Sequence, residues 1–376
     1  MTPLRIAEVV GARPQFVKLA SLSRAFSAVG RNRAEEFIVH TGQHYDSQLS
    51  AAFFDELDIP RASVNLEVGS GPHGRQTAAM LEKLEACFLE RRPDAVLVFG
   101  DTNSTLAGAL AAAKLGIPLA HVEAGLRSFN RAMPEEQNRV VADHLSDLLL
   151  APTDAAVNNL RDEGLRQRTH LVGDVMYDAV LVNAELARRR SRVLERLHLE
   201  PRGHGVVTLH RAENTTAAAI GPMLEILSGI AEAVIPLVFP VHPRTREVIR
   251  TSAPGWQPPA RLLLCEPLGP LDMLRLTEAA AVVITDSGGL QKEAFMLGRP
   301  CVTLRGETEW VETVEAGANV LVGRQFEAAI AAARSAVDNS RSAASSSRRA
   351  HLLYGEGQAA ARCVEKVLAM AETGCG

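Results

Sequence analysis

Two carboxylates in this chain each stand directly after a run of apolar residues. Asp101 follows the run that ends at Phe99 and a glycine, and Glu123 ends the run 118–122. Such runs are typical of strands buried on both faces of a parallel sheet. Ligands of open α/β sheets bind at the carboxyl ends of these strands. The spacing therefore predicts carboxylates placed for proton transfer, with Glu135 and Arg139 as further candidate ionic groups close behind them.

The same layout recurs near the end of the chain, with different chemistry. An apolar run ending at Thr285 leads into Asp286 and then Ser287, Gly288 and Gly289 at an expected helix start. Free backbone N–H groups and the positive end of a helix dipole suit a phosphate there. The alternative is an ordinary tight turn, because short glycine motifs are weakly specific.

Strand and helix patterns alternate along the whole chain, which predicts an α/β fold. Its 376 residues suit two domains of ordinary size. We expect two Rossmann-like domains facing each other across a central cleft. The first covers residues 1–173 and carries the carboxylates, and the second covers 174–354 and carries the phosphate-binding turn. A terminal helix, 355–376, is expected to pack back on the first domain.

Composition narrows the class of partner. The formal charge is −4, and no run of Lys or Arg is interleaved with aromatic residues, so we expect no nucleic-acid partner. The five cysteines are scattered without metal-binding spacing. No apolar stretch reaches the roughly 20 residues of a membrane span. The first ten residues resemble a strand and have no signal-peptide core, so we expect a cytoplasmic protein.

An ordered set of motifs now points to a family. The set comprises Gly11-Ala-Arg-Pro14, Gly100-Asp-Thr102, Val122-Glu-Ala-Gly-Leu-Arg127, Pro134-Glu-Glu136 with Asn138-Arg139, His210-Arg211 with Glu213-Asn214, Pro240-Val-His-Pro243, and Thr285-Asp-Ser-Gly-Gly289 with Glu293. From residue 5 to about residue 360 the chain resembles the non-hydrolysing UDP-N-acetylglucosamine 2-epimerases. The resemblance implies a glycosyltransferase B-type fold, a UDP-sugar substrate in the interdomain cleft, no metal and no nicotinamide or other cofactor. We also expect a homodimer.

The resemblance also assigns roles to matching positions. It implies epimerisation at C2 by loss of the C2 proton and of UDP, followed by re-addition. Asp101, Glu123 and Glu135 match the acid/base carboxylates, and His210 matches an acid or electrostatic partner near the phosphates. The matching ligand-binding positions are Arg13 and Lys18 as cleft cations, Ser287, Gly288 and Gly289 as diphosphate donors, and Glu293 as acceptor for the ribose hydroxyls. Arg139 is expected near the site.

Most of these residues have a structural alternative. Asp101 could cap a helix, and Glu135 could complement a helix dipole, as we expect for its neighbour Glu136. His210 could be a core histidine. His121 and His144 are expected to be structural. Arg127 and Arg139 could both be structural salt-bridge partners of the carboxylates.

Three departures from the family pattern bear on substrate and regulation. Gln15 stands where better-known members have Glu, and Trp310 stands where they have Arg. Asp46 replaces a glutamine of the family's regulatory site, which puts activation by UDP-N-acetylglucosamine in doubt. Variants of this kind resemble the branch that includes UDP-2,3-diacetamido-glucuronate 2-epimerases. A glycosyltransferase on the same fold and a silent nucleotide-sugar sensor are the remaining alternatives, and the retained carboxylates argue against the sensor.

Overall fold

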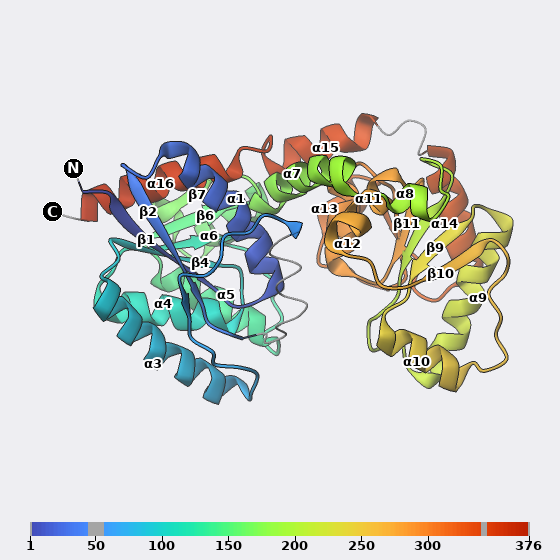
Figure 1. The fold of residues 1–376 in the computed structure, drawn as a ribbon, viewed down its shortest axis with the longest axis horizontal. Helices are drawn as coiled ribbons and strands as arrows, with labels where there is room; N and C mark the ends of the chain where they lie inside the picture. The colour runs from blue at the N-terminus through green and yellow to red at the C-terminus, as the bar shows by residue number, and fades with distance from the viewer. Residues whose placement is uncertain (1, 44–55, 340–343, 375–376) are drawn as a thin grey trace. The chain divides into compact units, whose positions relative to one another are not determined.

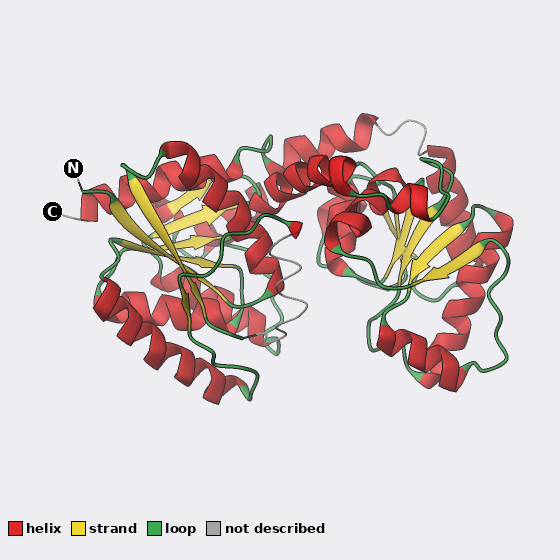
Figure 2. Cartoon of the chain, in the orientation of Figure 1, coloured by secondary structure: helices red, strands yellow, loops and turns green. Residues whose placement is uncertain are grey.

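The structure, a computed structural model, describes residues 2–43, 56–339 and 344–374. It divides into two compact units, Met1–Ala179 with Leu353–Gly376, and Val180–Leu352. Each unit is an α/β layer structure in which helices cover both faces of a parallel sheet (Figures 1 and 2). Among the described helices, none is long and apolar enough to cross a bilayer.

The first unit contains a seven-stranded sheet. Its strands are β1 (Leu4–Val10), β2 (Ala34–His40), β3 (Val64–Asn65), β4 (Ala95–Phe99), β5 (Leu119–Val122), β6 (Leu148–Ala151) and β7 (Thr169–Leu171). Its helices are α1 (Arg13–Val29), α3 (His73–Arg91), α4 (Asn103–Leu115), α5 (Pro134–Leu145), α6 (Asp154–Asp162), the short 3₁₀ helix η1 (Arg166–Arg168) and α16 (Ala359–Gly374). Helix α7 (Val175–Arg190) begins in this unit and continues into the second.

The second unit contains a six-stranded sheet. Its strands are β8 (Gly205–Thr208), β9 (Leu237–Pro240), β10 (Leu262–Cys265), β11 (Val282–Thr285), β12 (Cys301–Thr303) and β13 (Asn319–Leu321). Its helices are α8 (Val193–Arg196), α9 (Ala217–Ala233), α10 (Pro243–Ser252), α11 (Pro270–Ala279), α12 (Gly288–Met296), α13 (Val311–Glu315), α14 (Phe326–Asn339) and α15 (Ala344–Tyr354), the last of which ends in the first unit.

The two sheets have the same strand order. The first is β3-β2-β1-β4-β5-β6-β7 and the second is β10-β9-β8-β11-β12-β13, with every strand pair parallel. In each sheet the order reverses at its centre, between β1 and β4 and between β8 and β11. Ligands of open α/β sheets bind at the carboxyl ends of the strands on either side of such a reversal. Both units are therefore Rossmann-like, and each has its own switch point for a ligand.

Local sequence explains the elements that reach these switch points. All five residues of β4 are buried, because the strand is covered on both faces. Thr102 caps α4 by accepting the N–H of Thr105, and Gly116 ends the helix with φ +67°. The chain then returns through Pro118 into β5. The capping by Thr102 shows that the helix-cap alternative for Asp101 is wrong.

The C-terminal helix α16 packs on the first unit, against α1, β1, β4 and β6. Its amino end is held by Asp178, whose carboxylate accepts the backbone N–H of Ala360 at 2.8 Å. The other carboxylate oxygen is buried and has no hydrogen-bond partner within the described part of the chain. Burial, helped by the nearby Asp174, raises the pKa of Asp178 to about 6 against the lowering effect of the Ala360 and Ala359 N–H groups.

This raised pKa makes stability depend on pH in a definite direction. The pKa of Asp178 in the folded protein lies above its ordinary value near 4, so the folded state binds the proton more tightly than the unfolded state. This proton contributes fully to the stability of the fold below about pH 4, and the contribution is lost as the pH rises through about 6. We expect Asp178→Asn to remove this part of the pH dependence, which is at most about 3 kcal/mol. The free energy of unfolding would be measured for both proteins from pH 4 to about pH 7.

Glu8 and Glu36, whose pKa values are also raised by burial, act in the same direction in both proteins and cancel in the difference. Asp162→Asn is the matched control, since Asp162 is 70% exposed beside Arg161. A difference between variant and wild type that does not change with pH would contradict the prediction.

Candidate functional site

The loops at the first switch point are joined by Gln15. Its side-chain oxygen accepts the N–H groups of Gly11 and Ala12 at 2.8 and 3.0 Å. Its amide nitrogen donates to the Phe99 carbonyl at 2.8 Å and to Thr102 Oγ1 at 3.0 Å. An amide can accept and donate at once without carrying charge, whereas an ionised Glu could only accept. Gln15, in place of Glu, therefore joins the loop after β1 to the loop after β4 without adding a negative charge.

Glu123 leaves the end of β5 and forms an ion pair with Lys18 of α1. Both side chains are about nine-tenths buried. Gly100 lies beside them: a Cβ on this residue would stand 3.2 Å from Glu123 Oε2 and 3.4 Å from Lys18 Nζ. The backbone is left-handed at both Gly100 (φ +60°) and Glu123 (φ +71°), a conformation that is uncommon outside glycine. Strand end, cation and carboxylate are thus fixed together.

Asp101 is paired with Arg139, and Arg139 is in turn held by Glu136. Arg139 donates to Asp101 Oδ2 at 2.5 Å and to Glu136 Oε2 at 2.8 Å. Glu136 also accepts the N–H and hydroxyl of Ser128 and the N–H of Phe129. Although burial opposes ionisation, these donors lower the pKa of Glu136. The network fixes Arg139, and through it Asp101, against the loop that follows β5.

The environments of Glu135 and Glu136 are the reverse of those expected from the sequence. Glu135 is exposed in the first turn of α5, whereas Glu136 is buried with 4% of its surface exposed. The interpretation of Glu136 as only a first-turn charge is therefore wrong. Adjacent helical residues point about 100° apart, so the sequence alone could not tell which glutamate faces the sheet. Arg13 begins α1, but its side chain lies outside the described part of the chain.

His121 is structural, as expected, and has a demanding environment. It is completely buried on β5 and contacts Asp143 of α5 and the carbonyl of Gly100. Asp143 also binds Arg127. The Arg127 guanidinium forms a bidentate ion pair with Glu163, from Nε to Oε1 and from Nη2 to Oε2, both at 2.7 Å. Arg127 is therefore a partner of Asp143 and Glu163 and not of the predicted acid/base carboxylates. His144, also expected to be structural, contacts Glu163 from the exposed side of α5.

The second switch point is organised by Asp286, a fully buried carboxylate at the end of β11. It accepts the backbone N–H groups of His210 and Arg211 and the side-chain amide of Asn214, all between 3.0 and 3.2 Å. The His210 ring is about half exposed, with Nδ1 3.7 Å from Asp286 Oδ1. The alternative of a core histidine is thus wrong. The motif contained Asp286, but its role as the acceptor that shapes this loop was not foreseen.

Ser287 caps helix α12, and Gly288 is its first residue. A Cβ on Gly288 would overlap Glu309 Oε1 at 2.2 Å, so a carboxylate of the chain itself packs against the amino end of this helix. Gly289 is exposed, with open space around it. Trp310 donates its indole N–H to the Gly288 carbonyl at 2.9 Å, and Lys292 Nζ lies 4.2 Å from the Trp310 ring centroid. The tryptophan therefore braces the turn.

Glu293 lies one turn further along α12. Burial raises its pKa to about 7. A carboxylate poised to ionise near neutral pH is a frequent mark of functional sites. Within the second unit, the structure thus gathers His210, the turn at Ser287 to Gly289 and Glu293 around the end of β11. Asp46 of the doubtful regulatory loop lies outside the described residues.

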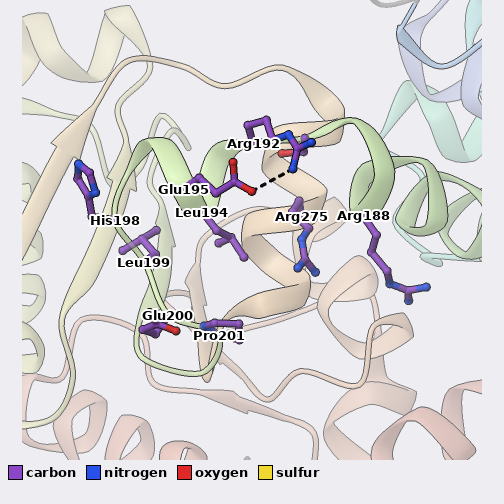
Figure 3. A pocket seen from close by; sticks show the side chains of 10 residues that line it. Arg188, Arg192, Leu194, Glu195, His198, Leu199, Glu200, Pro201 and Arg275 are labelled. Atoms are coloured by element: carbon purple, nitrogen blue, oxygen red, sulfur yellow. Dashed lines mark hydrogen bonds and ion pairs between the residues drawn. The ribbon is translucent and has the colours of Figure 1, made fainter.

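A separate hollow of about 480 Å³ lies in the second unit, among α7, α8 and α11 (Figure 3). Its three arginines are compensated by glutamates. Arg192 pairs with Glu195, and both Arg188 and Arg275 pair with Glu278. None of the sequence-predicted site residues lines this hollow, so it is separate from the candidate site.

Comparison with known proteins decides the family. The family model described as UDP-N-acetylglucosamine 2-epimerase matches residues 27–368. The chain belongs to this family. The UDP-N-acetylglucosamine 2-epimerase homolog of Methanococcus maripaludis is 46% identical over 96% of this chain and 99% of its own. The UDP-2,3-diacetamido-2,3-dideoxy-D-glucuronate 2-epimerase of Pseudomonas aeruginosa is 43% identical over 96% and 99%.

Solved structures agree with the family in fold. The UDP-GlcNAc 2-epimerase of Methanocaldococcus jannaschii matches with a TM-score of 0.84 at 38% identity, covering 97% of this chain and 100% of that one. A second structure of that protein, in complex with UDP-GlcNAc and UDP, matches with a TM-score of 0.82 at 38% identity over the same shares of the two chains. The predicted fold class, the family resemblance and the isomerase class of the enzyme are confirmed.

The tight packing around Gly100 leads to a stability prediction. Gly100→Ala combines a left-handed backbone with crowding of the Lys18–Glu123 pair. Gly116→Ala shares the left-handed backbone (φ +67°) but has open space, so it serves as the control. We expect about 1 kcal/mol of destabilisation from the backbone in each variant and a further loss only in Gly100→Ala. Chemical denaturation would measure both, and equal losses would show that the ion pair gives way without cost.

Proposed function

We propose that this chain epimerises C2 of UDP-N-acetylglucosamine to give UDP-N-acetylmannosamine, by elimination and re-addition of UDP. The observation that carries the proposal is the pair of ion-paired carboxylates, Glu123 with Lys18 and Asp101 with Arg139, on adjacent strand ends of one sheet. A metal-free inversion at C2 needs two acid/base groups, one for each face of the sugar. Asp101 and Glu123 supply them, and the exposed Glu135 is a third candidate.

The proposed reaction is an elimination of UDP followed by its re-addition. One carboxylate takes the C2 proton while the C1–O bond to UDP breaks, which leaves a double bond between C1 and C2. The opposite step restores the C1–O bond to UDP while a proton is delivered to the other face of C2. Because UDP leaves with one negative charge more than its diphosphate carries in the substrate, cations and aligned N–H groups must stabilise this developing charge. We assign this task to His210 and the turn at Ser287, Gly288 and Gly289, with Arg13 and Lys18 as further cations.

Glu293 is proposed to accept the ribose hydroxyls, so the nucleotide is recognised mainly by the second unit. The carboxylates belong to the first unit, and we propose that each unit supplies one half of the chemistry. A homodimer and a cytoplasmic location stay predictions of the sequence, as do the absence of a metal and of a cofactor.

A second substrate is favoured by one relative. The Pseudomonas aeruginosa enzyme, 43% identical, is named for UDP-2,3-diacetamido-2,3-dideoxy-D-glucuronate. Both sugars have an acetamido group and a hydrogen on C2, which the proposed mechanism uses. Incubation of the protein with each UDP-sugar in deuterated water distinguishes them, because deuterium enters at C2 only of the sugar that the enzyme deprotonates.

The acid/base assignment predicts the behaviour of two variants. Asp101→Asn and Glu123→Gln keep size and remove the proton acceptor, so turnover should fall by on the order of 100-fold or more. UDP affinity should fall much less than in Glu293→Ala, because most of the proposed nucleotide site belongs to the second unit. Turnover would be followed by epimer formation and UDP affinity by calorimetry.

Asp154→Asn is the control for this pair, as Asp154 is an exposed carboxylate in the first turn of α6. Near-normal turnover in both test variants would remove these carboxylates from the mechanism. If Glu123→Gln lost as much UDP affinity as Glu293→Ala, the assignment of the nucleotide to the second unit would be wrong.

The raised pKa of Glu293 predicts a pH-dependent affinity. A carboxylate accepts ribose hydroxyls better when ionised, so affinity should rise with pH up to about 7 and then level off. UDP-N-acetylglucosamine is the better ligand here, since its diphosphate is esterified at both ends and does not titrate near neutral pH. Calorimetric titration in the Asp101→Asn background avoids turnover. Glu293→Gln should bind more weakly and without this pH dependence, and a wild-type profile retained in that variant would refute the assignment.

A further inference from the structure

A chain of buried charged residues begins at His121, between the ends of β4 and β5. His121 Nδ1 lies 2.6 Å from Asp143 Oδ1, and its Nε2 lies 2.7 Å from the carbonyl oxygen of Gly100. The side chains of His121 and Asp143 are both 0% exposed. Both contacts are short for hydrogen bonds to a ring nitrogen, so each demands a proton in the correct place.

The hydrogen-bond donors and acceptors around the His121 ring determine where those protons are. The Gly100 carbonyl can only accept, so Nε2 must donate. Asp143 Oδ2 accepts the Gly125 N–H at 3.1 Å and lies 2.7 Å from Arg127 Nη1, and neither partner can accept a proton in return. Although burial opposes it, His121 and Arg127 hold the pKa of Asp143 below its usual value. Asp143 is therefore a carboxylate, Nδ1 donates to it as well, and His121 is an imidazolium.

The position of this imidazolium in the sheet gives it a task. The β4–β5 ladder ends where the Gly100 N–H donates to the Val122 carbonyl at 3.0 Å. Beyond that bond both chains turn into left-handed backbone, at Gly100 and at Glu123. The Nε2–H bond from His121 to Gly100 is a side-chain link between the two strands at this point, one residue before Asp101 and two before Glu123.

We propose that His121, held as an imidazolium by Asp143, is a positioning residue that sets the separation of the two carboxylates Asp101 and Glu123. This inference rests on the proposed acid/base role of those carboxylates. Because a displacement of about 1 Å in a reacting group can cost on the order of 100-fold in rate, a link at this place controls turnover without touching substrate.

Two substitutions separate the two halves of the His121 contact. The amide nitrogen of His121→Asn lies near the place of Nδ1 and can still donate to Asp143, but it cannot reach Gly100. The amide of His121→Gln reaches farther and can donate to the Gly100 carbonyl while giving up Asp143. We expect kcat to fall on the order of 10- to 100-fold in His121→Asn, less in His121→Gln, and KM and UDP affinity to stay within about twofold of wild type.

His204→Gln is the matched control. His204 is also buried, at 1% exposure, but it lies in the second unit between two backbone carbonyls at 3.3 Å. Within the described residues it has no carboxylate in ion-pair distance, and burial lowers its pKa. Its substitution should cost stability without lowering kcat per folded molecule. A fall in kcat for His121→Asn no larger than that for His204→Gln, or a larger fall in His121→Gln than in His121→Asn, would overturn the proposal.

Nitrogen-15 NMR of the histidine-labelled wild-type protein tests the same idea without any variant having to fold or any substrate being known. Near neutral pH, His121 should show protons on both ring nitrogens. His204 should show one, because both of its carbonyl contacts are long at 3.3 Å, it has no carboxylate partner among the described residues, and burial lowers its pKa. A neutral His121 ring would overturn the proposal. Failure of wild-type protein to epimerise either UDP-sugar would instead refute the proposed function, and the NMR result would still stand on its own.

Discussion

The constraint on which the first unit depends is that charges brought to the end of a buried sheet must be neutralised within the same unit. Taking an ionised carboxylate out of water costs several kcal/mol unless a cation and hydrogen bonds replace the solvent. Glu123 meets this requirement through Lys18, Asp101 through Arg139, and Asp143 through His121 and Arg127. Each cation comes from a different element, so satisfying the charges also determines how α1, β5 and α5 pack around the switch point.

In the second unit, whose six strands follow the order of the first six of the other sheet, the buried carboxylate at the end of β11 is satisfied without a cation. Asp286 is satisfied by backbone N–H groups and an amide, so it shapes the His210 loop without drawing a cation into the core. Glu309 packs against Gly288 and also binds Arg305 at 2.9 Å. The first unit therefore neutralises its buried acids with cations, whereas the second satisfies Asp286 with N–H donors.

Two residues that depart from the family pattern, Gln15 and Trp310, make hydrogen bonds that explain their presence. Gln15 links two loops because an amide both donates and accepts, and Trp310 keeps a hydrogen-bond donor on Gly288 where an arginine is expected. Lys292 lies over the Trp310 ring, so a positive charge is retained close to the lost guanidinium. The network of Ser128, Glu136 and Arg139 has no counterpart among the sequence-based expectations. It depends on the loop before α5 folding back so that Ser128 and Phe129 reach Glu136, eight and seven residues later, which no local pattern records.

The sequence by itself determined the class of fold, the repeated strand-end layout and the family, because apolar runs, glycine breaks and ordered motifs are local properties. It also determined that Asp101 and Glu123 stand at strand ends. Only the tertiary structure decided which charges meet: that Lys18 binds Glu123 across 105 residues, that Glu136 and not Glu135 is buried, and that His121 must carry two protons. Such pairings depend on the direction of side chains from elements distant in sequence, and periodicity carries no information about that direction.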